Sequence, residues 1–250
     1  MKSKETCGLI PTGINQIDRA IGGLKCGELS VVASVPNYLS RDFAIKLATN
    51  IGIRNKTPMA YFSLELSSLQ IVNRLIVNFT GISREDLSKL SKDELDKMAM
   101  PLSESPIYID DTVSIPMNEL ETKIRRYSRE HVAKLVFIDY LQLMNEVTGV
   151  RSERWQQAIN NIISSLKRLA KELKLHIVVR NQLTKFTNNP DGLRWFCTFM
   201  SFLGPNSVLF IEADNILTLF EERNTKEVFA GIWDADLENI ATITLDLKKY

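Results

Sequence analysis

The sequence predicts an α/β fold, with a mostly parallel central sheet, helices on both of its faces and a β-hairpin near the C-terminus. Short apolar runs alternate with longer segments of helical periodicity, as parallel strands and their connecting helices do. The runs are apolar almost throughout, which is typical of strands buried on both faces. Near the C-terminus, residues 227–232 and 242–247 have the pattern of two paired strands.

The expected strands are short and mostly apolar. The fourth, residues 135–139, reads LVFID and ends in a carboxylate. Because ligands bind at the carboxyl ends of the strands in such sheets, the residues after each strand are the first candidates for a site. Before the hairpin, the expected strands are residues 29–34, 59–64, 107–110, 135–139, 176–180, 208–212 and 216–220.

Helices are expected between these strands. Residues 42–53 carry apolar side chains at helical spacing, and a break that contains Pro58 follows them. Residues 83–100 begin with Ser83, which suits an N-cap, and they predict one or two short, solvated helices. The expected helices are residues 42–53, 67–79, 83–100, 116–131 and 155–173, and residues 184–206 are expected to form a long loop.

The length and composition fit one compact globular domain, or a core with a small appendage. Of 250 residues, 44% are hydrophobic and 24% are charged, and 31 Lys and Arg against 30 Asp and Glu leave a net charge of +1. This balance excludes a uniformly basic surface for nucleic acid but leaves a local basic groove open. The 3 cysteines form no CxxC pair, which argues against a disulfide framework or a structural zinc site. Because no apolar run has membrane-spanning length and the N-terminus has no signal-like apolar segment, we expect a cytoplasmic protein without membrane contact.

Ordered motifs lie at the expected strand ends. They are TGINQID at residues 12–18, GGL at 22–24, GEL at 27–29, FSLEL at 62–66, IYIDD at 107–111, FIDYLQLM at 137–144, SLKRLAKEL at 165–173, NQL at 181–183 and IEAD at 211–214. In this order they resemble the C-terminal motor domain of DnaB-type replicative DNA helicases. The resemblance implies a RecA-like P-loop ATPase core over residues 1–250, as one domain, with the separate N-terminal domain of the family absent.

The resemblance also implies roles for single residues. The family hydrolyses ATP at the interfaces of a hexamer and couples this hydrolysis to movement along single-stranded DNA. Three positions match its catalytic residues: Glu65 would orient the attacking water, Asp139 would hold Mg²⁺ through the water shell, and Gln182 would sense the γ-phosphate. In the loop that faces DNA in the family, this chain offers only Lys185 and Arg194 as basic residues.

The phosphate-binding loop departs from the family pattern, which is Gly/Ala-x-Pro-x-x-Gly-Lys-Thr/Ser. Leu39 stands where the second Gly belongs, Ser40 where the Lys belongs, and Arg41 where the Ser or Thr belongs. The Leu side chain crowds the phosphate cradle, Ser has no charge to offer the phosphates, and Arg cannot coordinate Mg²⁺. Any nucleotide would have to bind to this degenerate P-loop, which comprises Pro36, Asn37, Tyr38, Leu39, Ser40, Arg41 and Asp42.

A second part of the family's site is also altered. The family carries a Lys-x-Arg pair on a late strand, which reaches the γ-phosphate of the neighbouring subunit. The corresponding residues here are Ile232, Trp233 and Asp234, and no Lys or Arg occurs between Val228 and Thr244. Because both ends of one composite site are changed, we predict a pseudo-ATPase, which is the family fold without its catalytic charges.

The predicted function is therefore binding. The protein would bind single-stranded DNA, replication proteins or copies of itself in a hexamer, and no cofactor is expected. ATP and Mg²⁺ would be ligands only if the divergent site still accepts them. One alternative is an active, divergent ATP-dependent 5'-3' helicase in which Arg41 replaces the P-loop Lys. Another is a decayed mobile-element paralogue without activity. Arg41 itself could be a solvated or salt-bridged side chain, or it could, with Asp42, cap its helix and bind phosphate or sulfate directly.

Other conspicuous residues have simpler explanations. His131 and His176 are isolated from other ligand types, so no metal is expected at either. A cluster of aromatic residues fits packing against the core or a partner, or stacking on bases; its members are Trp195, Phe196, Phe199 and Phe202. Two basic runs are interpreted as the solvated faces of amphipathic helices; they are Arg125, Arg126, Arg129 and Lys134, and Lys167, Arg168, Lys171 and Lys174.

Overall fold

The structure, a computed structural model, describes residues 8–34, 39–144, 152–182, 212–221, 228–234 and 239–245. Its centre is an eight-stranded sheet in the order β3-β2-β4-β5-β1-β6-β7-β8. The strands from β3 to β6 pair in parallel, and β7 and β8 pair antiparallel at one edge. This arrangement confirms the predicted fold class. The strands are β1 (Leu29–Ser34), β2 (Met59–Ser63), β3 (Ile107–Asp110), β4 (Leu135–Asp139), β5 (His176–Gln182), β6 (Asn215–Glu221), β7 (Val228–Asp234) and β8 (Asn239–Leu245).

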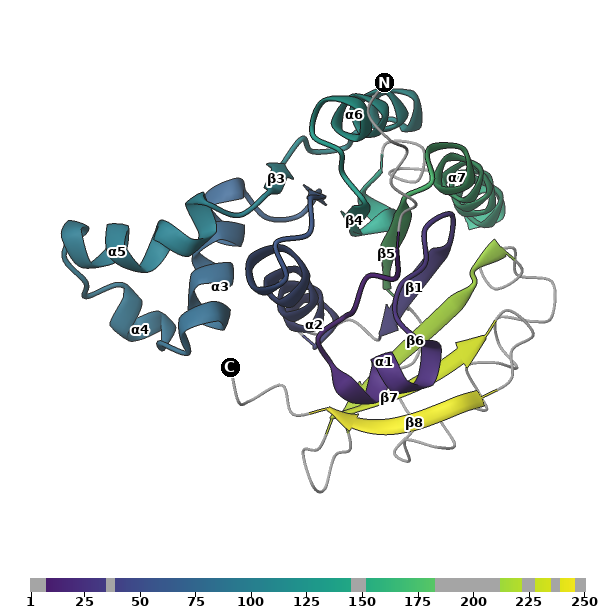
Figure 1. The fold of residues 1–250 in the computed structure, drawn as a ribbon. Coiled ribbons are helices and arrows are strands. Elements are labelled where there is room, and N and C mark those ends of the chain that lie inside the picture. The colour runs from purple at the N-terminus through teal and green to yellow at the C-terminus, as the bar shows by residue number, and fades with distance from the viewer. Residues whose placement is uncertain are drawn as a thin grey trace.

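Helices cover both faces of the sheet (Figure 1). One apolar core lies between the sheet and α1, α2 and α3, and the other lies between the sheet and α6 and α7. The pair α4 and α5 extends away from the sheet beside α3 and buries none of its residues. The helices are α1 (Asn15–Ile21), α2 (Leu39–Ala48), the π-helix η1 (Thr49–Arg54), α3 (Ser68–Thr80), α4 (Arg84–Leu87), α5 (Lys92–Ser103), α6 (Met117–Glu130), the 3-10 helix η2 (Leu141–Leu143) and α7 (Ser152–Leu173).

The expected elements differ from the structure in some details. The helix expected over residues 42–53 begins at Leu39 and ends in the π-helix η1, because the apolar spacing does not distinguish the two hydrogen-bond patterns. The short helix α1 was not expected. The expected strand 208–212 lies outside the described residues except for Glu212, which is not in a strand. The expected hairpin is present as β7 and β8.

The pleat of the sheet decides which side chains face α2. On β4, Val136 and Ile138 pack with α6 and α7, whereas Leu135 and Phe137 face the opposite core. Successive residues of a strand point to opposite faces, so the next residue in this series, Asp139, lies on the side of α2. The same alternation places Tyr61 of β2 and Arg180 of β5 on that side.

Part of the two basic helix faces is ion-paired with neighbouring carboxylates. Arg125 of α6 pairs with Glu172 of α7, and Arg168 of α7 pairs with Glu121 of α6 at 3.2 Å. Lys167 was expected on a solvated face but is buried, because it pairs with Asp214 ahead of β6. These contacts tie α6 to α7 and α7 to the sheet.

Cys26 is disulfide-bonded, which the sparse cysteine count did not predict, because spacing in the sequence does not show which residues meet in space.

Within the described residues, no helix is long and apolar enough to cross a membrane.

Candidate functional site

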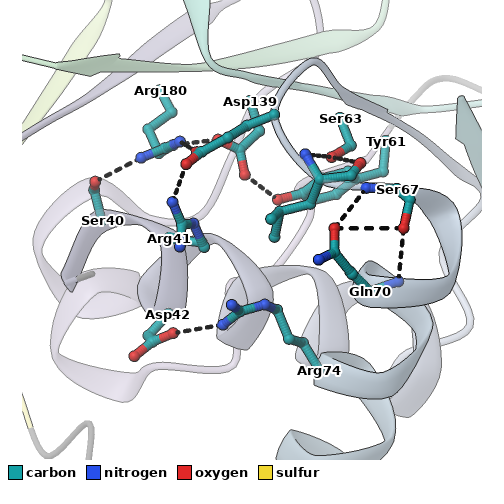
Figure 2. A network of polar contacts seen from close by, with 12 residues as sticks. Ser40, Arg41, Asp42, Tyr61, Ser63, Ser67, Gln70, Arg74, Asp139 and Arg180 are labelled. Carbon is teal, nitrogen blue, oxygen red and sulfur yellow. Dashed lines mark hydrogen bonds and ion pairs between the residues drawn. The ribbon is translucent and has the colours of Figure 1, made fainter. Parts of the chain in front are cut away.

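Side chains from four segments meet at the carboxyl end of the sheet, on the side of α2 (Figure 2). Ser40 and Arg41 come from the first turn of α2, and Glu65 follows β2. Asp139 ends β4, and Arg180 lies near the end of β5. The structure thus brings together Glu65, Asp139 and the Ser40–Arg41 pair, as a site at the strand ends requires.

Arg180 is the centre of this cluster, and the sequence analysis gave it no role. It is 1% exposed, its Nε forms an ion pair with Asp139, and its Nη2 bonds to Oε2 of Glu65 at 2.7 Å. Its Nη1 donates to Oγ of Ser40 at 3.2 Å. The ring of Tyr140 covers the guanidinium, whose Cζ lies 4.5 Å from the ring centroid. No sequence signal distinguished it, because a charged residue after an apolar run is also typical of the solvated end of a strand, whereas Arg180 lies within the buried part of β5.

Asp139 is also buried and has a donor on each carboxylate oxygen. Oδ1 pairs with Arg180, and Oδ2 accepts a hydrogen bond of 2.6 Å from the hydroxyl of Tyr61. Burial raises the pKa of Tyr61 well above its ordinary value, and the nearby carboxylate of Asp139 raises it further. The phenol of Tyr61 therefore keeps its proton and donates it in a hydrogen bond to Asp139.

Glu65 is held between two arginines. Its Oε1 pairs with Arg41, and its Oε2 pairs with Arg180. Arg41 is partly exposed, with 21% of its side chain accessible, so it closes the outer side of the cluster. Each carboxylate oxygen of Glu65 and Asp139 consequently bonds to a donor that the chain itself supplies.

The segment that carries Glu65 is fixed by local hydrogen bonds. Oγ of Ser63 donates to the carbonyl oxygen of Leu66 at 2.7 Å and accepts from its N–H at 3.2 Å. Ser67 then caps α3: its Oγ accepts from the N–H of Gln70, and Oε1 of Gln70 accepts from the N–H of Ser67 at 3.0 Å. This reciprocal capping box places the N-cap of α3 two residues after Glu65.

The other residues of the altered loop are used in packing. Leu39 is 3% exposed and lies in the core under α2, and Ser40 is 1% exposed. Asp42 faces Arg74 and Arg84, with ion-pair distances of 3.6 and 3.8 Å. Burial raises the pKa of Asp42, against the opposing effect of the arginines around it.

Gln182 ends β5 outside this cluster of charges. Its N–H donates to Oε1 of Gln142 at 3.2 Å, and its carbonyl oxygen accepts from Nε2 of Gln142 at 2.7 Å. The same Nε2 donates to Oδ1 of Asn181 at 2.5 Å. The described structure therefore joins Gln182 to η2 and not to Glu65 or Asp139.

Some predicted site residues lie outside the described residues. They are Pro36, Asn37 and Tyr38 of the loop before α2, and Lys185 and Arg194 of the expected DNA-facing loop.

The described side chains do not fit a divalent cation as arranged here. Mg²⁺ needs carboxylate or hydroxyl oxygens and water around it. The oxygens of Asp139 and Glu65 are bonded to Arg41, Arg180 and Tyr61. Among the described residues, no group of three His, Cys, Asp or Glu side chains is arranged to hold a metal ion.

Comparison with known proteins identifies the family. The model of the DnaB-like helicase C-terminal domain matches residues 9–223. The chain is 32% identical over 218 residues to the replicative DNA helicase DnaB of Geobacillus stearothermophilus. The matched region covers 85% of this chain and 47% of that protein. The chain is also 33% identical over 245 residues to the replicative DNA helicase DnaC of Bacillus subtilis. This matched region covers 96% of this chain and 51% of that protein. The chain thus spans about half the length of these relatives.

Solved structures show the same fold. A solved ATPase domain superposes with a TM-score of 0.77 at 24% identity and covers 97% of this chain and 89% of its own. A DnaB-like replicative helicase, solved in a study of its interactions with primase, superposes with a TM-score of 0.75 at 23% identity and covers 97% of this chain and 59% of its own. Together with the ordered motifs, these matches show that the chain belongs to the DnaB-like helicase C-terminal domain family.

Proposed function

We propose that this DnaB-like replicative helicase domain does not hydrolyse ATP and acts by binding DNA or replication proteins. One observation carries the proposal: both carboxylates at the family's catalytic positions, Glu65 and Asp139, are neutralised by arginines of the same chain. A carboxylate paired in this way is a poor ligand for a metal and is not free to orient an attacking water, because the arginines already supply its counter-charge and each of its oxygens already accepts a hydrogen bond.

The altered P-loop supports the same proposal. Ser40 stands at the position of the phosphate-binding Lys, is buried and accepts a hydrogen bond from Arg180. Loss of one group that stabilises developing charge typically costs about 3–4 kcal/mol of transition-state stabilisation. The chain has lost the Lys at Ser40 and the metal-binding hydroxyl at Arg41, so efficient hydrolysis is not expected.

Binding is the activity that such a domain keeps. The family relatives are replicative DNA helicases, and the structural relative solved in a study with primase is one of them. We propose that this chain contacts single-stranded DNA through Lys185 and Arg194, or contacts replication proteins or copies of itself through the outer surface of the same fold. The even charge balance predicts that DNA contacts, where made, are few and local.

Titration calorimetry with Mg-ATP tests the catalytic part of the proposal. We expect no heat of binding at micromolar nucleotide and no phosphate release, with or without single-stranded DNA. Micromolar binding together with turnover that Glu65→Gln abolishes would show instead an active, divergent helicase. Arg125→Met, which removes a surface arginine from the opposite side of the sheet, is the control for general damage.

A salt titration of binding to fluorescent oligo-dT tests the DNA part. Phosphate contacts predict that the logarithm of the association constant falls linearly with the logarithm of salt concentration, by about 0.7 per contact for a single strand. Lys185→Ala and Arg194→Ala should each reduce this slope, whereas Lys92→Ala on α5 should not. A protein that binds no oligo-dT at low salt would leave protein partners as the proposed ligands and would refute the DNA contact.

A further inference from the structure

We infer that Arg180 is a built-in counter-ion that occupies the place of a divalent cation at the strand ends. The inference rests on the positions assigned to Glu65 and Asp139 in the proposed function, and it adds what fills their site. Three oxygens converge on one guanidinium: Oδ1 of Asp139, Oε2 of Glu65 and Oγ of Ser40. They come from three different segments of the chain, as the ligands of a bound ion commonly do.

The chemistry of these oxygens is that of a hard-cation site. Carboxylate and hydroxyl oxygens are the ligands that Mg²⁺ and Ca²⁺ prefer. Here the cation at their centre is a side chain that the neighbouring strand supplies. In the parallel register, Ile138 of β4 pairs with Val179 of β5, so the next residues along, Asp139 and Arg180, lie side by side. The position of the guanidinium is thus set by the sheet and not by a flexible loop (Figure 2).

Charge balance argues against a metal ion in addition to the arginines. The two carboxylates of Glu65 and Asp139 face the two guanidinium groups of Arg41 and Arg180. A divalent cation would leave two uncompensated positive charges, in a cluster whose central residue is 1% exposed. Uncompensated charge in such a place is costly, so an ion can enter only by displacing Arg180.

Arg41 and Arg180 differ in how they contact the two carboxylates. The ion pair of Arg41 within the described structure is with Glu65 and not with Asp139, and 21% of its side chain is accessible. Arg180 contacts both carboxylates and the first turn of α2, and Tyr140 covers its face. We therefore assign the role of counter-ion to Arg180. A consequence is that the first turn of α2 is joined to the ends of β2 and β4 without any ligand.

Titration with Mn²⁺ in the absence of nucleotide, followed by the electron paramagnetic resonance signal of free Mn²⁺, tests the inference. At up to about 1 mM Mn²⁺, the wild-type protein should show no Mn²⁺ site that depends on Asp139, that is, no site that Asp139→Asn removes. Such a site in the wild type would overturn the inference directly, without any substitution at Arg180. Turnover of ATP is a separate measurement, so failure of the proposed function and failure of this inference can be told apart.

Arg180→Met supplies the positive half of the test. It removes the charge but keeps an unbranched side chain, and the uncovered oxygens should then take up one Mn²⁺ at least 10-fold more tightly than in the wild type. Asp139→Asn in the same background should abolish that site. Arg125→Met also removes an arginine from two glutamates, Glu121 and Glu172, but on the surface between α6 and α7, where Arg168 still pairs with Glu121. It should gain no comparable site. A folded Arg180→Met protein that gains no Mn²⁺ would refute the inference. Should Arg180→Met not fold, the wild-type titration still decides.

Discussion

Arg180 and Asp139 form an ion pair in which each residue is 1% exposed. Removal of two charges from water is expensive, and their attraction offsets this cost only when the remaining donors and acceptors are also satisfied. Tyr61 satisfies the second oxygen of Asp139, while Glu65 and Ser40 accept from the rest of the guanidinium. The pair is therefore part of a closed network, and loss of one member leaves charge without a partner.

The first prediction is that Arg180→Met is strongly destabilising. It leaves Asp139 buried without its cation, and breakage of a buried pair from one side typically costs about 3–5 kcal/mol. The free energy of unfolding, from urea titrations followed by circular dichroism, measures the loss. Arg125→Met, which breaks a surface pair with Glu172, should cost less than about 1 kcal/mol.

A double-mutant cycle extends this prediction. Asp139→Asn in the Arg180→Met background removes the orphaned charge, so the double variant should be more stable than the sum of the single losses predicts, by about 1–3 kcal/mol. Additive losses would show that the two residues do not depend on each other in the folded state.

The second prediction concerns Ser40, the position at which the family carries a Lys. Ser40→Lys places a second cation beside Nη1 of Arg180, which lies 3.2 Å from Oγ, in a position that is 1% exposed. We expect a loss of about 3 kcal/mol or more in the free energy of unfolding, against about 1.5 kcal/mol for Ser40→Ala, which only loses a hydrogen bond.

The cost of Ser40→Lys should fall in the Arg180→Met background, because the new ammonium then no longer lies beside the guanidinium of Arg180, while Arg41 still pairs with Glu65. An equal cost in both backgrounds would mean that crowding, and not charge, opposes the Lys. The expected result also explains why introducing a Lys at residue 40 would not by itself rebuild a phosphate site in this chain.

The elements of the fold were largely predictable because the apolar runs report burial directly. The runs before Ser34, Ser63 and Asp139 are buried strands, and their common edge holds the site as the topology of parallel sheets requires. The π-helix and α1 were not predictable, since the first shares its periodicity with an α-helix and the second has only seven residues.

The role of Arg180 could not be read from the sequence. Its partners Ser40, Glu65 and Asp139 lie 140, 115 and 41 residues away along the chain. An arginine after a buried run is also what the solvated end of a strand looks like, and the expected strand ended at that residue. Only the continuation of β5 to Gln182 shows that Arg180 is interior.

The third prediction tests the anchoring of α3. Ser67→Ala removes the capping box with Gln70 and should cost about 1 kcal/mol in the free energy of unfolding. Ser91→Ala removes the equivalent capping box with Glu94 from α5, which buries none of its residues. Because fraying of α5 exposes little core, Ser91→Ala should cost less than about 0.5 kcal/mol. Equal costs at both serines would contradict this account of how α3, and with it the segment around Glu65, is held.

The last prediction is a pH dependence of stability that originates at His176. This residue is fully buried on the strand β5, with Nε2 at 2.9 Å from Oγ of Ser30 and Nδ1 at 2.7 Å from the carbonyl oxygen of Lys25. Burial lowers the pKa of His176 to about 4, although the hydrogen bond with Lys25 opposes the shift. Between pH 6.5 and about 4 the unfolded chain therefore binds a proton that the folded protein excludes, and stability falls as the pH falls through this window. From pH 7 to pH 5 the loss should be about 2 kcal/mol, at 1.36 kcal/mol per pKa unit. Urea unfolding at half-unit steps of pH measures it, and His176→Gln, which cannot take up the proton, should flatten the curve over this range. A variant that keeps the wild-type slope would show that other groups cause the dependence.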